Sequence, residues 1–431
     1  MQSVRGMQDI LPEDVKYWQH IYNIALELLD SANYQEIRTP IVEHKSLFDR
    51  SIGQDTDIIS KEMYTFYDRS NRALTLRPEG TAGIARAIIQ NHLYKNNSIQ
   101  KLWYLGPMFR YERPQQGRQR QFHQLGIECY GSNHPVLDAE VIYLAYNLLK
   151  RLKCGDTLLE INSIGSKEER KLYKDKLQEY FLQYINNLDD VYAQQVLKNP
   201  LRLLDSKDSQ VKLLITEAPK ITQYLKKQSI QRFDCVQQYL YDLNIKFTLN
   251  HNLVRGLDYY NDTVFELKTK ELGAQDTICG GGRYDGLTKQ LGGNQVNAIG
   301  WGIGIERLLL LIQHNISIVT RKICIYIATQ KLEYLGYSLQ LLPIIQKYNL
   351  KYELDVSGSS IKKQLQKANQ QNSMICIIIG SQEIEQQTVT VKWLYKHTQE
   401  NYSLPSFSEL IPKIALQYNN IIQKKHSTLE I

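Results

Sequence analysis

Several residues of this 431-residue sequence could together bind a small polar ligand. Side chains two apart share one face of a strand, so Phe122, Gln124 and Glu128 in the predicted strand Gln121–Tyr130 point the same way. An aromatic ring, an amide and a carboxylate on one face make a suitable floor for such a ligand. Arg110, at the end of the predicted partner strand, could reach the same face. Alternatively, these polar side chains simply meet solvent, as is common on one face of an antiparallel sheet.

A second group lies in Leu76–Thr81, where a short predicted strand leads into a helix. Glu79 and Thr81 could contact a ligand there. Carboxylates and hydroxyls also favour helix starts as capping groups. On this motif alone, capping is the simpler interpretation.

The segment Arg255–Tyr260 places a guanidinium, a carboxylate and the two phenols of Tyr259 and Tyr260 within six residues. Farther along, Ile278–Gly286 contains consecutive glycines, which let backbone approach a ligand closely. The glycine spacing does not match a dinucleotide-binding fingerprint, and no βαβ unit surrounds it. The glycines alone are therefore a weak indication of a binding site.

Gly300–Leu308 reads as a glycine-rich strand that runs into an apolar helix, with Arg307 at the helix start. A positive side chain is unfavourable there, because the helix N-terminus already carries a partial positive charge. A bound anion would relieve this conflict, so Arg307 is a candidate anion ligand.

The elements that position these residues follow from periodicity and turn composition. Apolar residues at helical spacing predict a helix over Pro12–Leu29. Lys101–Tyr111 and Gln121–Tyr130 predict an antiparallel hairpin, whose basic tip Glu112–Arg120 contains Pro and Gly. The stretch from about 166 to 249 is helical and charged, which predicts a helical insertion.

The C-terminal part alternates strands and helices between Ile323 and Ile379. This alternation predicts a small α/β domain with a largely parallel sheet. A chain of this length is too long for one compact core, so we expect separate domains.

Composition excludes several classes of protein. The longest apolar runs are too short to cross a bilayer, so we expect no membrane association. The opening MQSVRGMQDILPED has no apolar core, so we expect no targeting peptide. The six cysteines stand singly without metal-ligand spacing, which argues against disulfides and structural zinc. A net charge of +7 is compatible with an acidic partner without requiring one.

Taken together, these segments resemble class II aminoacyl-tRNA synthetases, and specifically the histidyl-tRNA synthetase family, over nearly the whole chain. The segment around Pro40, Gly106–Gln124 and Gly302–Leu308 are similar to the three class motifs. Arg255–Tyr260 and Gly281–Leu287 are similar to the two signatures of the histidine enzymes.

The resemblance implies an α+β fold: a class II antiparallel sheet with flanking helices and a helical insertion, followed by a C-terminal α/β anticodon-binding domain. We expect a catalytic domain over 1–321, with its insertion at about 166–249, and the anticodon-binding domain over 322–431. It also implies a homodimer whose interface is built by the first motif.

The activity implied by the resemblance is activation of L-histidine with ATP, followed by transfer of the histidyl group to the 3′ end of histidine tRNA. Arg110 and Arg255 would act as catalytic cations on the α-phosphate of ATP. Arg307 would hold the γ-phosphate and, with Phe122, sandwich the adenine. Mg²⁺ would bridge the outer phosphates, and no metal ligand from the protein is expected.

The histidine ligands are likewise implied by the resemblance. Glu79, Thr81 and Gln124 would hold the amino end of histidine. Glu128 and Tyr260 would bond the two imidazole nitrogens, with Tyr259 beside them.

Arg113 and Gln115 match family residues that recognise the extra 5′ guanosine of histidine tRNA. In the same loop the chain departs from the family, because Gln116 and Gln119 stand where relatives often have Lys and Tyr. This departure slightly weakens the positive field of the loop.

Two other functions are alternatives to that of a ligase. A catalytically inactive, histidine-sensing regulatory paralogue would typically lack Arg255–Tyr260 and the anticodon-binding domain, and this chain has both. A general RNA-binding protein would not explain a set of ligands for an amino acid and ATP. The abundance of Asn, Lys, Ile and Tyr favours a plastid-encoded protein of the chloroplast stroma over a bacterial cytoplasmic one.

Overall fold

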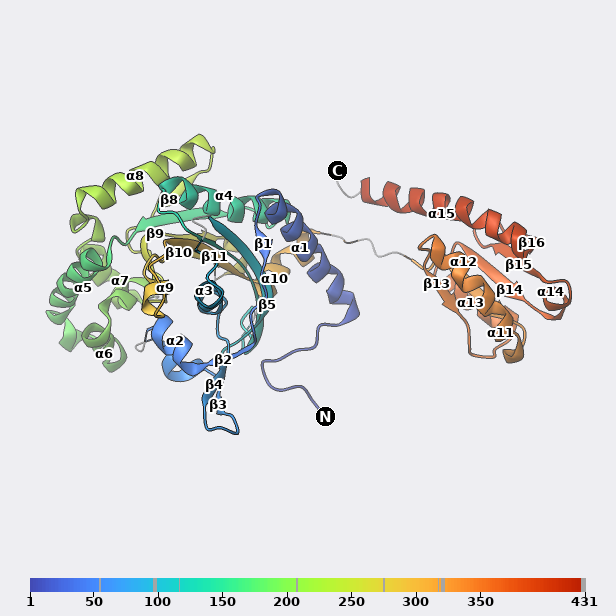
Figure 1. Cartoon of the computed structure of the whole chain (residues 1–431), viewed down its shortest axis with the longest axis horizontal. Coiled ribbons are helices and arrows are strands. Elements are labelled where there is room, and N and C mark those ends of the chain that lie inside the picture. Colours follow the sequence, from blue (N-terminus) through green and yellow to red (C-terminus); the bar gives the residue numbers. More distant parts are fainter. Residues whose placement is uncertain are drawn as a thin grey trace. The chain divides into compact units, whose positions relative to one another are not determined.

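The computed structural model describes residues 1–53, 56–95, 99–115, 117–206, 208–273, 276–316, 318 and 322–427. The chain forms two compact units, Met1–Ile316 and Ser317–Ile431, and each is described by itself (Figure 1). The predicted domain boundary involves residue 321, which lies outside the described residues. None of the helices in the described ranges is long and apolar enough to cross a membrane.

A large sheet forms the body of the first unit, and its described strands follow the order β1-β5-β6-β11-β10-β9-β7-β8. The central strands from β5 to β7 pair antiparallel, while β1 and β8 pair parallel to their neighbours at the two edges. The expected antiparallel sheet is therefore confirmed. In sheet order the strands span Gln35–Glu36, Gln100–Phe109, Gln121–Tyr130, Ala298–Gly304, Thr277–Arg283, Asn261–Lys268, Leu158–Ser163 and Phe247–Leu249.

The two faces of this sheet have different roles, because side chains alternate along each strand. In β6 and β11 the odd-numbered residues, such as Ile127 and Trp301, belong to an apolar core. Helices α1 (Pro12–Ser31), α4 (Pro135–Arg151) and α10 (Ile305–Asn315) cover that face. The even-numbered residues point to the opposite face, where the predicted site residues lie.

The predicted hairpin is confirmed, with one difference at the end of its first strand. Strand β5 ends at Phe109, two residues before the predicted end, so Arg110 begins the connecting loop. There the Arg110 backbone N–H donates to the carbonyl of Arg120 at 2.8 Å, which keeps Arg110 at the base of the loop. Strand β6 has the predicted bounds Gln121–Tyr130.

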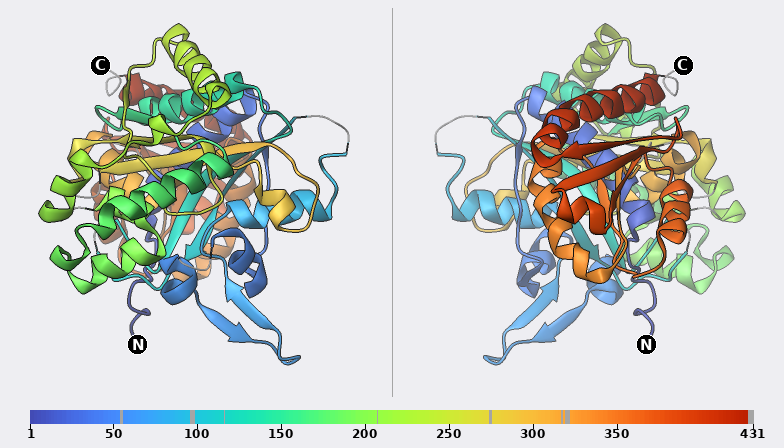
Figure 2. Two further views of the ribbon diagram at one scale, coloured as in Figure 1. Left: turned by 90° about the vertical axis from the view of Figure 1, so that its left-hand side faces the viewer. Right: turned by 90° about the vertical axis from the view of Figure 1, so that its right-hand side faces the viewer.

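A smaller described sheet, β2-β4-β3, comprises Val42–His44, Ala73–Leu76 and Thr65–Tyr67. The β3–β4 hairpin stands out from the body of the unit (Figure 2). Next to this sheet lie α2 (Lys45–Ser51) and a π-helical turn over Ile58–Glu62. Strand β4 leads through residues 77–80 into α3 (Thr81–Gln90), as predicted for the Leu76–Thr81 motif.

The predicted insertion contains four helices in its described residues, which gather at one end of the unit in Figure 1. These are α5 (Lys167–Leu182), α6 (Asp190–Lys198), α7 (Ser209–Glu217) and α8 (Lys227–Asp242), with 3₁₀ turns at Ile185–Asn187, Pro200–Asp205 and Ile221–Gln223. At the end of the predicted range, Phe247–Leu249 forms β8 and returns the chain to the main sheet. After it come a 3₁₀ turn at Lys270–Leu272 and the short helix α9 (Leu287–Gln290).

The C-terminal unit has a mixed sheet rather than the predicted largely parallel one. Its described strands follow the order β13-β12-β14-β15-β16, with parallel pairing among the first three and antiparallel pairing from β14 to β16. The parallel prediction was wrong because two further strands, Thr388–Trp393 and Thr398–Ser403, were not predicted and continue the sheet from β14 with antiparallel pairing. The strands are Tyr352–Leu354, Ile325–Thr329, Ile375–Ile379, Thr388–Trp393 and Thr398–Ser403.

The helices of this unit are α11 (Leu335–Ser338), α12 (Leu342–Lys347), α13 (Ile361–Gln370), α14 (Ser381–Glu385) and α15 (Leu404–Ser427), with 3₁₀ turns at Leu332–Tyr334 and Leu339–Leu341. The single helix predicted over Leu335–Tyr348 is interrupted by the second of these turns. Pro343 explains the new start, because its fixed φ suits the first turn of α12.

A fully buried ion pair joins α4 to the end of β10. Asp138 and Arg283 are both 0% exposed, and the carboxylate accepts hydrogen bonds from the guanidinium. Asp138 also accepts from Thr263 Oγ1 at 2.7 Å and from Arg232 of α8 at 3.1 Å. Nη1 of Arg283 donates to Oδ1 of Asp285 at 2.9 Å. This network therefore fixes the backbone on both sides of residue 284.

Replacing Asp138 by Ala should strongly destabilise the first unit. The variant leaves the Arg283 guanidinium buried without its main anionic partner, which costs about 3–5 kcal/mol. Urea unfolding followed by circular dichroism measures this loss. The matched control is Asp49→Ala, which breaks the half-exposed Lys45–Asp49 pair of α2 and should cost less than about 1 kcal/mol. Equal losses in the two variants would contradict the importance of the buried pair.

Candidate active site

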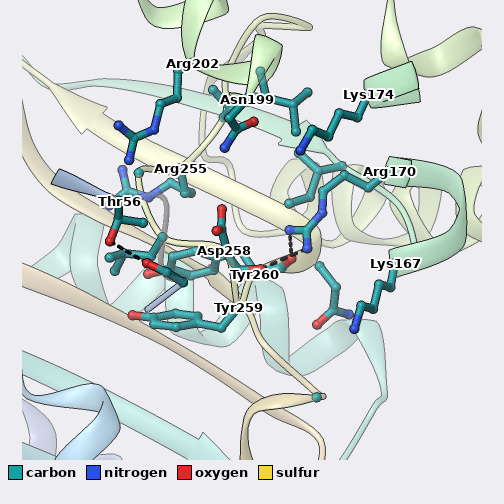
Figure 3. A pocket seen from close by; sticks show the side chains of 18 of the residues that line it. Thr56, Lys167, Arg170, Lys174, Asn199, Arg202, Arg255, Asp258, Tyr259 and Tyr260 are labelled. Carbon is teal, nitrogen blue, oxygen red and sulfur yellow. Dashed lines mark hydrogen bonds between the residues drawn. The ribbon is translucent and has the colours of Figure 1, made fainter. Parts of the chain in front are cut away.

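A cavity of about 1340 Å³ lies between the helical insertion and the irregular segment 251–260. Figure 3 shows Tyr259 and Tyr260 on one side of this cavity and basic side chains of the insertion on the other. Of the predicted site residues, Arg255, Tyr259 and Tyr260 line its wall. The remaining predicted residues are not part of the wall.

Glu79 connects the cavity wall to a buried polar cluster. Its carboxyl is 2% exposed and accepts a hydrogen bond from the Tyr259 hydroxyl at 3.0 Å. The other carboxyl oxygen accepts from the Ala82 backbone N–H at 2.9 Å, at the start of α3. Glu79 therefore caps the helix and also faces Tyr259. Burial raises the pKa of Glu79, while the contacts with Ala82 and Tyr259 oppose that rise.

Glu128 is the most strongly perturbed carboxyl of this cluster. It is 1% exposed and accepts hydrogen bonds from the Thr81 hydroxyl at 2.7 Å and from the Tyr284 hydroxyl. Burial raises its pKa to about 8, and the nearby charge of Glu79 adds to the rise. At neutral pH the free site therefore keeps a proton on Glu128.

Gln124 forms the next part of the same face. Its Oε1 accepts from the Gly80 backbone N–H and from the Tyr104 hydroxyl, both at 3.1 Å. These contacts leave its amide nitrogen as the donor for a ligand. The predicted common face of Phe122, Gln124 and Glu128 carries this polar cluster, so these side chains do not simply meet solvent.

The glycine-rich strand β11 makes this arrangement sterically possible. Side chains of β6 lean across β11, so a Cβ at Gly300 would lie 2.0 Å from Oε2 of Glu128. A Cβ at Gly302 would lie 2.4 Å from Nε2 of Gln124. Any larger residue at these positions would displace the two polar side chains.

Arg110 lies at the base of the loop after β5. Its Nε donates to the Pro78 carbonyl at 2.9 Å, and its guanidinium carbon lies 5.2 Å from the centre of the Phe122 ring. Nη1 is 3.8 Å from the Glu112 carboxylate. Arg110 therefore reaches the face that carries Phe122, as expected from the sequence.

Arg255 extends over β10, where a Cβ at Gly280 would lie 2.4 Å from its guanidinium nitrogens. One of these nitrogens bonds the Glu266 carboxylate. Burial lowers the pKa of Arg255, but Glu266 together with the nearby phenols of Tyr260 and Tyr259 raises it, and the net shift is upward. Nε of Arg255 is buried and has no hydrogen-bond partner among the described residues. Its donors can therefore serve a further anion.

The pKa of Arg307 is influenced by the carboxylates that pair with Arg110 and Arg255. Burial lowers its pKa and the Arg118 charge adds to this, while Glu112 and Glu266 act in the opposite direction. These two carboxylates also pair with Arg110 and Arg255. Arg110 and Arg255 thus each pair with a carboxylate, while Arg307 donates to the Thr277 carbonyl, and the three guanidiniums could serve a polyanionic ligand.

The two predicted loop residues follow Glu112 in the chain, and Gln115 bonds Arg118, which pairs with Glu112 at 3.4 Å. Arg113 and Gln115 are exposed on the loop between β5 and β6. The Gln115 backbone forms reciprocal hydrogen bonds with Arg118 at 3.0 and 2.9 Å. Gln116 lies outside the described residues, and Gln119 is half-buried.

Several residues of the site were missed from the sequence. Tyr284 contacts Glu128, Tyr104 contacts Gln124, and Glu266 pairs with Arg255. For Tyr284 a signal existed, since it follows the glycines of Ile278–Gly286. The other two depend on contacts between distant strands, for which the sequence gives no local sign.

The described residues contain no group of three or more His, Cys, Asp or Glu side chains that could hold a metal ion. The carboxylates beside the arginines, Glu112 and Glu266, are each engaged with a guanidinium. A metal at this site would therefore take most of its ligands from a bound anion and water.

Comparison with known proteins identifies the relatives of this chain. The sequence profile of histidyl-tRNA synthetase matches residues 6–308, and that of an anticodon binding domain matches residues 322–414. The chain is 52% identical over 414 residues to the chloroplastic histidine–tRNA ligase of Gracilaria tenuistipitata var. liui, covering 96% of this chain and 98% of that protein. It is 50% identical over 400 residues to the histidine–tRNA ligase of Cyanothece sp., covering 93% of each.

The crystal structure of apo S. aureus histidyl-tRNA synthetase is similar to this chain with a TM-score of 0.79 at 35% sequence identity. The similarity covers 95% of this chain and 99% of that one.

Replacing Glu128 by Gln should remove part of the pH dependence of stability. Because the folded state raises the pKa of Glu128 from 4.5 to about 8, the stability contributed by its proton is complete below pH 4.5 and is lost as pH rises through 8. The wild-type protein should therefore lose stability relative to Glu128→Gln between about pH 5 and about pH 9. Thermal unfolding of both proteins across this range measures the difference, and parallel curves would contradict it.

Proposed function

The chain belongs to the histidyl-tRNA synthetase family, and we propose how its own residues divide the work of the reaction. The enzyme activates L-histidine with ATP, giving histidyl-adenylate and pyrophosphate, and transfers the histidyl group to the 3′ end of histidine tRNA. One observation supports the assignment of residues. A buried carboxyl and phenol cluster lies next to Arg110 and Arg255, which contact Phe122 and Tyr260 and each pair with a carboxylate.

Histidine binds in the buried polar cluster. Glu128 and Tyr260 bond the two imidazole nitrogens, and Tyr259 lies beside the ring. Glu79, Thr81 and Gln124 hold the amino end. The wrong amino acid would leave these buried groups without partners, which permits discrimination of about ten-thousandfold without an editing site.

ATP binds in the arginine cluster. Arg110 and Arg255 are the catalytic residues, because they contact the α-phosphate, where negative charge develops as the histidine carboxylate attacks. Arg307 holds the γ-phosphate and, together with Phe122, encloses the adenine. A planar guanidinium suits these roles, since it can bond two phosphate oxygens at once.

Mg²⁺ accompanies ATP and neutralises its outer phosphates. When bound, the ion would supply positive charge to the phosphates, and the described residues contain no group of three or more His, Cys, Asp or Glu side chains that could hold it. The residues of this chain therefore bind the nucleotide, and none is assigned to the metal.

Histidine tRNA is held at two places. Arg113 and Gln115, exposed on the loop between β5 and β6, contact the acceptor end and its extra 5′ guanosine. The C-terminal unit, which we place at 322–431, matches an anticodon binding domain and contacts the anticodon.

A homodimer follows from the exposed apolar residues around β2 and β3. Val42 is 42% exposed, Phe66 41% and Tyr67 67%, and they lie on the protruding sheet β2-β4-β3. We place the second copy against this sheet. Light scattering should give twice the chain mass, and Phe66→Asp combined with Tyr67→Asp should give a monomer. A monomeric wild-type protein would contradict this assembly.

The chloroplast stroma is the proposed compartment, because relatives about half identical to the chain are named chloroplastic ligases of Gracilaria and Pyropia. Recovery of the protein outside the plastid fraction of cells would contradict this location.

Two arginine variants separate the two binding functions. Arg255→His should lower histidine-dependent ATP–pyrophosphate exchange at least about 100-fold, because it removes fixed charge from the α-phosphate. Arg113→Ala should leave exchange within about twofold of wild type and lower tRNA charging, since it removes only a nucleic-acid contact. Each variant is the control for the other. Normal exchange in Arg255→His, or impaired exchange in Arg113→Ala, would refute the corresponding role.

A further inference from the structure

The backbone that carries Tyr259 and Tyr260 needs an external support. Residues 251–260 form neither helix nor strand, yet both phenols are 6% exposed and held in fixed contacts. Their rings lie 4.7 Å apart between centres, and the Tyr259 hydroxyl bonds Glu79. Regular secondary structure in the segment itself therefore cannot explain how the two rings are oriented.

Arg170, in the first helix of the insertion, supplies such a support. Its guanidinium donates to the backbone carbonyl of Asp258 at 2.9 Å and to that of Tyr260 (Figure 3). The two carbonyls flank Tyr259. Because a guanidinium is a rigid plane with several donors, bonding both carbonyls fixes the orientation of the peptides between them. The directions of the two tyrosine side chains depend on those peptides.

The position of Arg170 is itself fixed by the start of α5. Ser166 and Glu169 form a reciprocal capping box at the helix N-terminus. Glu169 is 2% exposed and also accepts from the Lys226 backbone N–H and from the Ser229 hydroxyl at 2.8 Å, which joins α5 to α8. Arg170 therefore extends from a helix end that is held in place by the capping box and by the contacts with α8.

Helix electrostatics do not favour an arginine at this position. Arg170 lies in the first turn and a half of α5, where the partial positive charge of the helix disfavours a cation. The side chain is only partly exposed and directs its hydrogen bonds to the two carbonyls of the site segment. These hydrogen bonds explain why an arginine occupies a position at which the helix charge disfavours one.

We propose that Arg170 is a positioning residue for histidine binding, through which the helical insertion holds Tyr259 and Tyr260 in the geometry that the amino acid requires. This proposal rests on the proposed function, in which those tyrosines contact histidine. Arg170 touches neither substrate in this assignment. The insertion thereby contributes to amino-acid recognition through the backbone of residues 258 and 260.

Arg170→Ala should raise the KM for histidine in ATP–pyrophosphate exchange about tenfold or more, because the freed segment misplaces the tyrosines. The KM for ATP should stay within about twofold, since Arg110 and Arg307 are held by other elements and Arg255 keeps its bond to Glu266 of β9. Arg170→Lys should recover only part of the loss, because one ammonium cannot match the planar fork across two carbonyls. Added guanidinium at millimolar concentration should lower the histidine KM of Arg170→Ala and leave that of wild type unchanged.

The matched control is Lys176→Ala, which removes a cation from the same helix at an exposed ion pair with Glu179. It should leave both KM values unchanged. Circular dichroism and titration of active sites correct for unfolded enzyme, which would lower kcat without changing KM. A histidine KM within twofold of wild type in Arg170→Ala, or an equal rise in both KM values, would refute the proposal. Absence of histidine-dependent exchange in the wild-type enzyme would instead refute the proposed function itself.

Discussion

The burial of two carboxyl groups, Glu79 and Glu128, is the constraint on which the site depends. A buried carboxyl must be hydrogen-bonded, because an unpartnered polar group in the interior is strongly destabilising. The donors come from three separate segments: Thr81 and the Ala82 N–H on α3, Tyr259 in the irregular segment, and Tyr284 after β10. Satisfying the two carboxyls therefore brings these segments together, and the same bonds orient the side chains that face a ligand.

The sheet meets this constraint by giving its two faces opposite compositions. In β11, Ile299, Trp301 and Ile303 pack into the core, while Gly300, Gly302 and Gly304 occupy alternate positions. The glycines leave space for the β6 side chains that lean over them, so the polar cluster lies directly on the backbone. Apolar packing on one face thus supplies the rigidity that the polar face needs, because the same strands form both.

Local patterns of the sequence predicted the hairpin, the α3 start and the shared face of Phe122, Gln124 and Glu128, whereas the main sheet was expected only from the resemblance to the family. Alternation and helix-start chemistry are properties of neighbouring residues, so they could be recognised without a structure. The contacts of Arg170 with residues 258 and 260, and of Glu266 with Arg255, join segments whose proximity only the fold creates. Strand β16 was missed for a local reason: Thr398–Ser403 is polar throughout and mostly exposed, so it lacks the alternation of a half-buried strand.

The arginine cluster shows how a cationic site remains stable in the free protein. Burying a guanidinium without an anion is costly, so each arginine needs a partner before a nucleotide arrives. Glu266 and Glu112 fill this need for Arg255 and Arg110, and both carboxylates also act on Arg307. The guanidinium charges are therefore held in place in the free protein. Fixed charges accelerate a reaction most when they are positioned before the substrate binds.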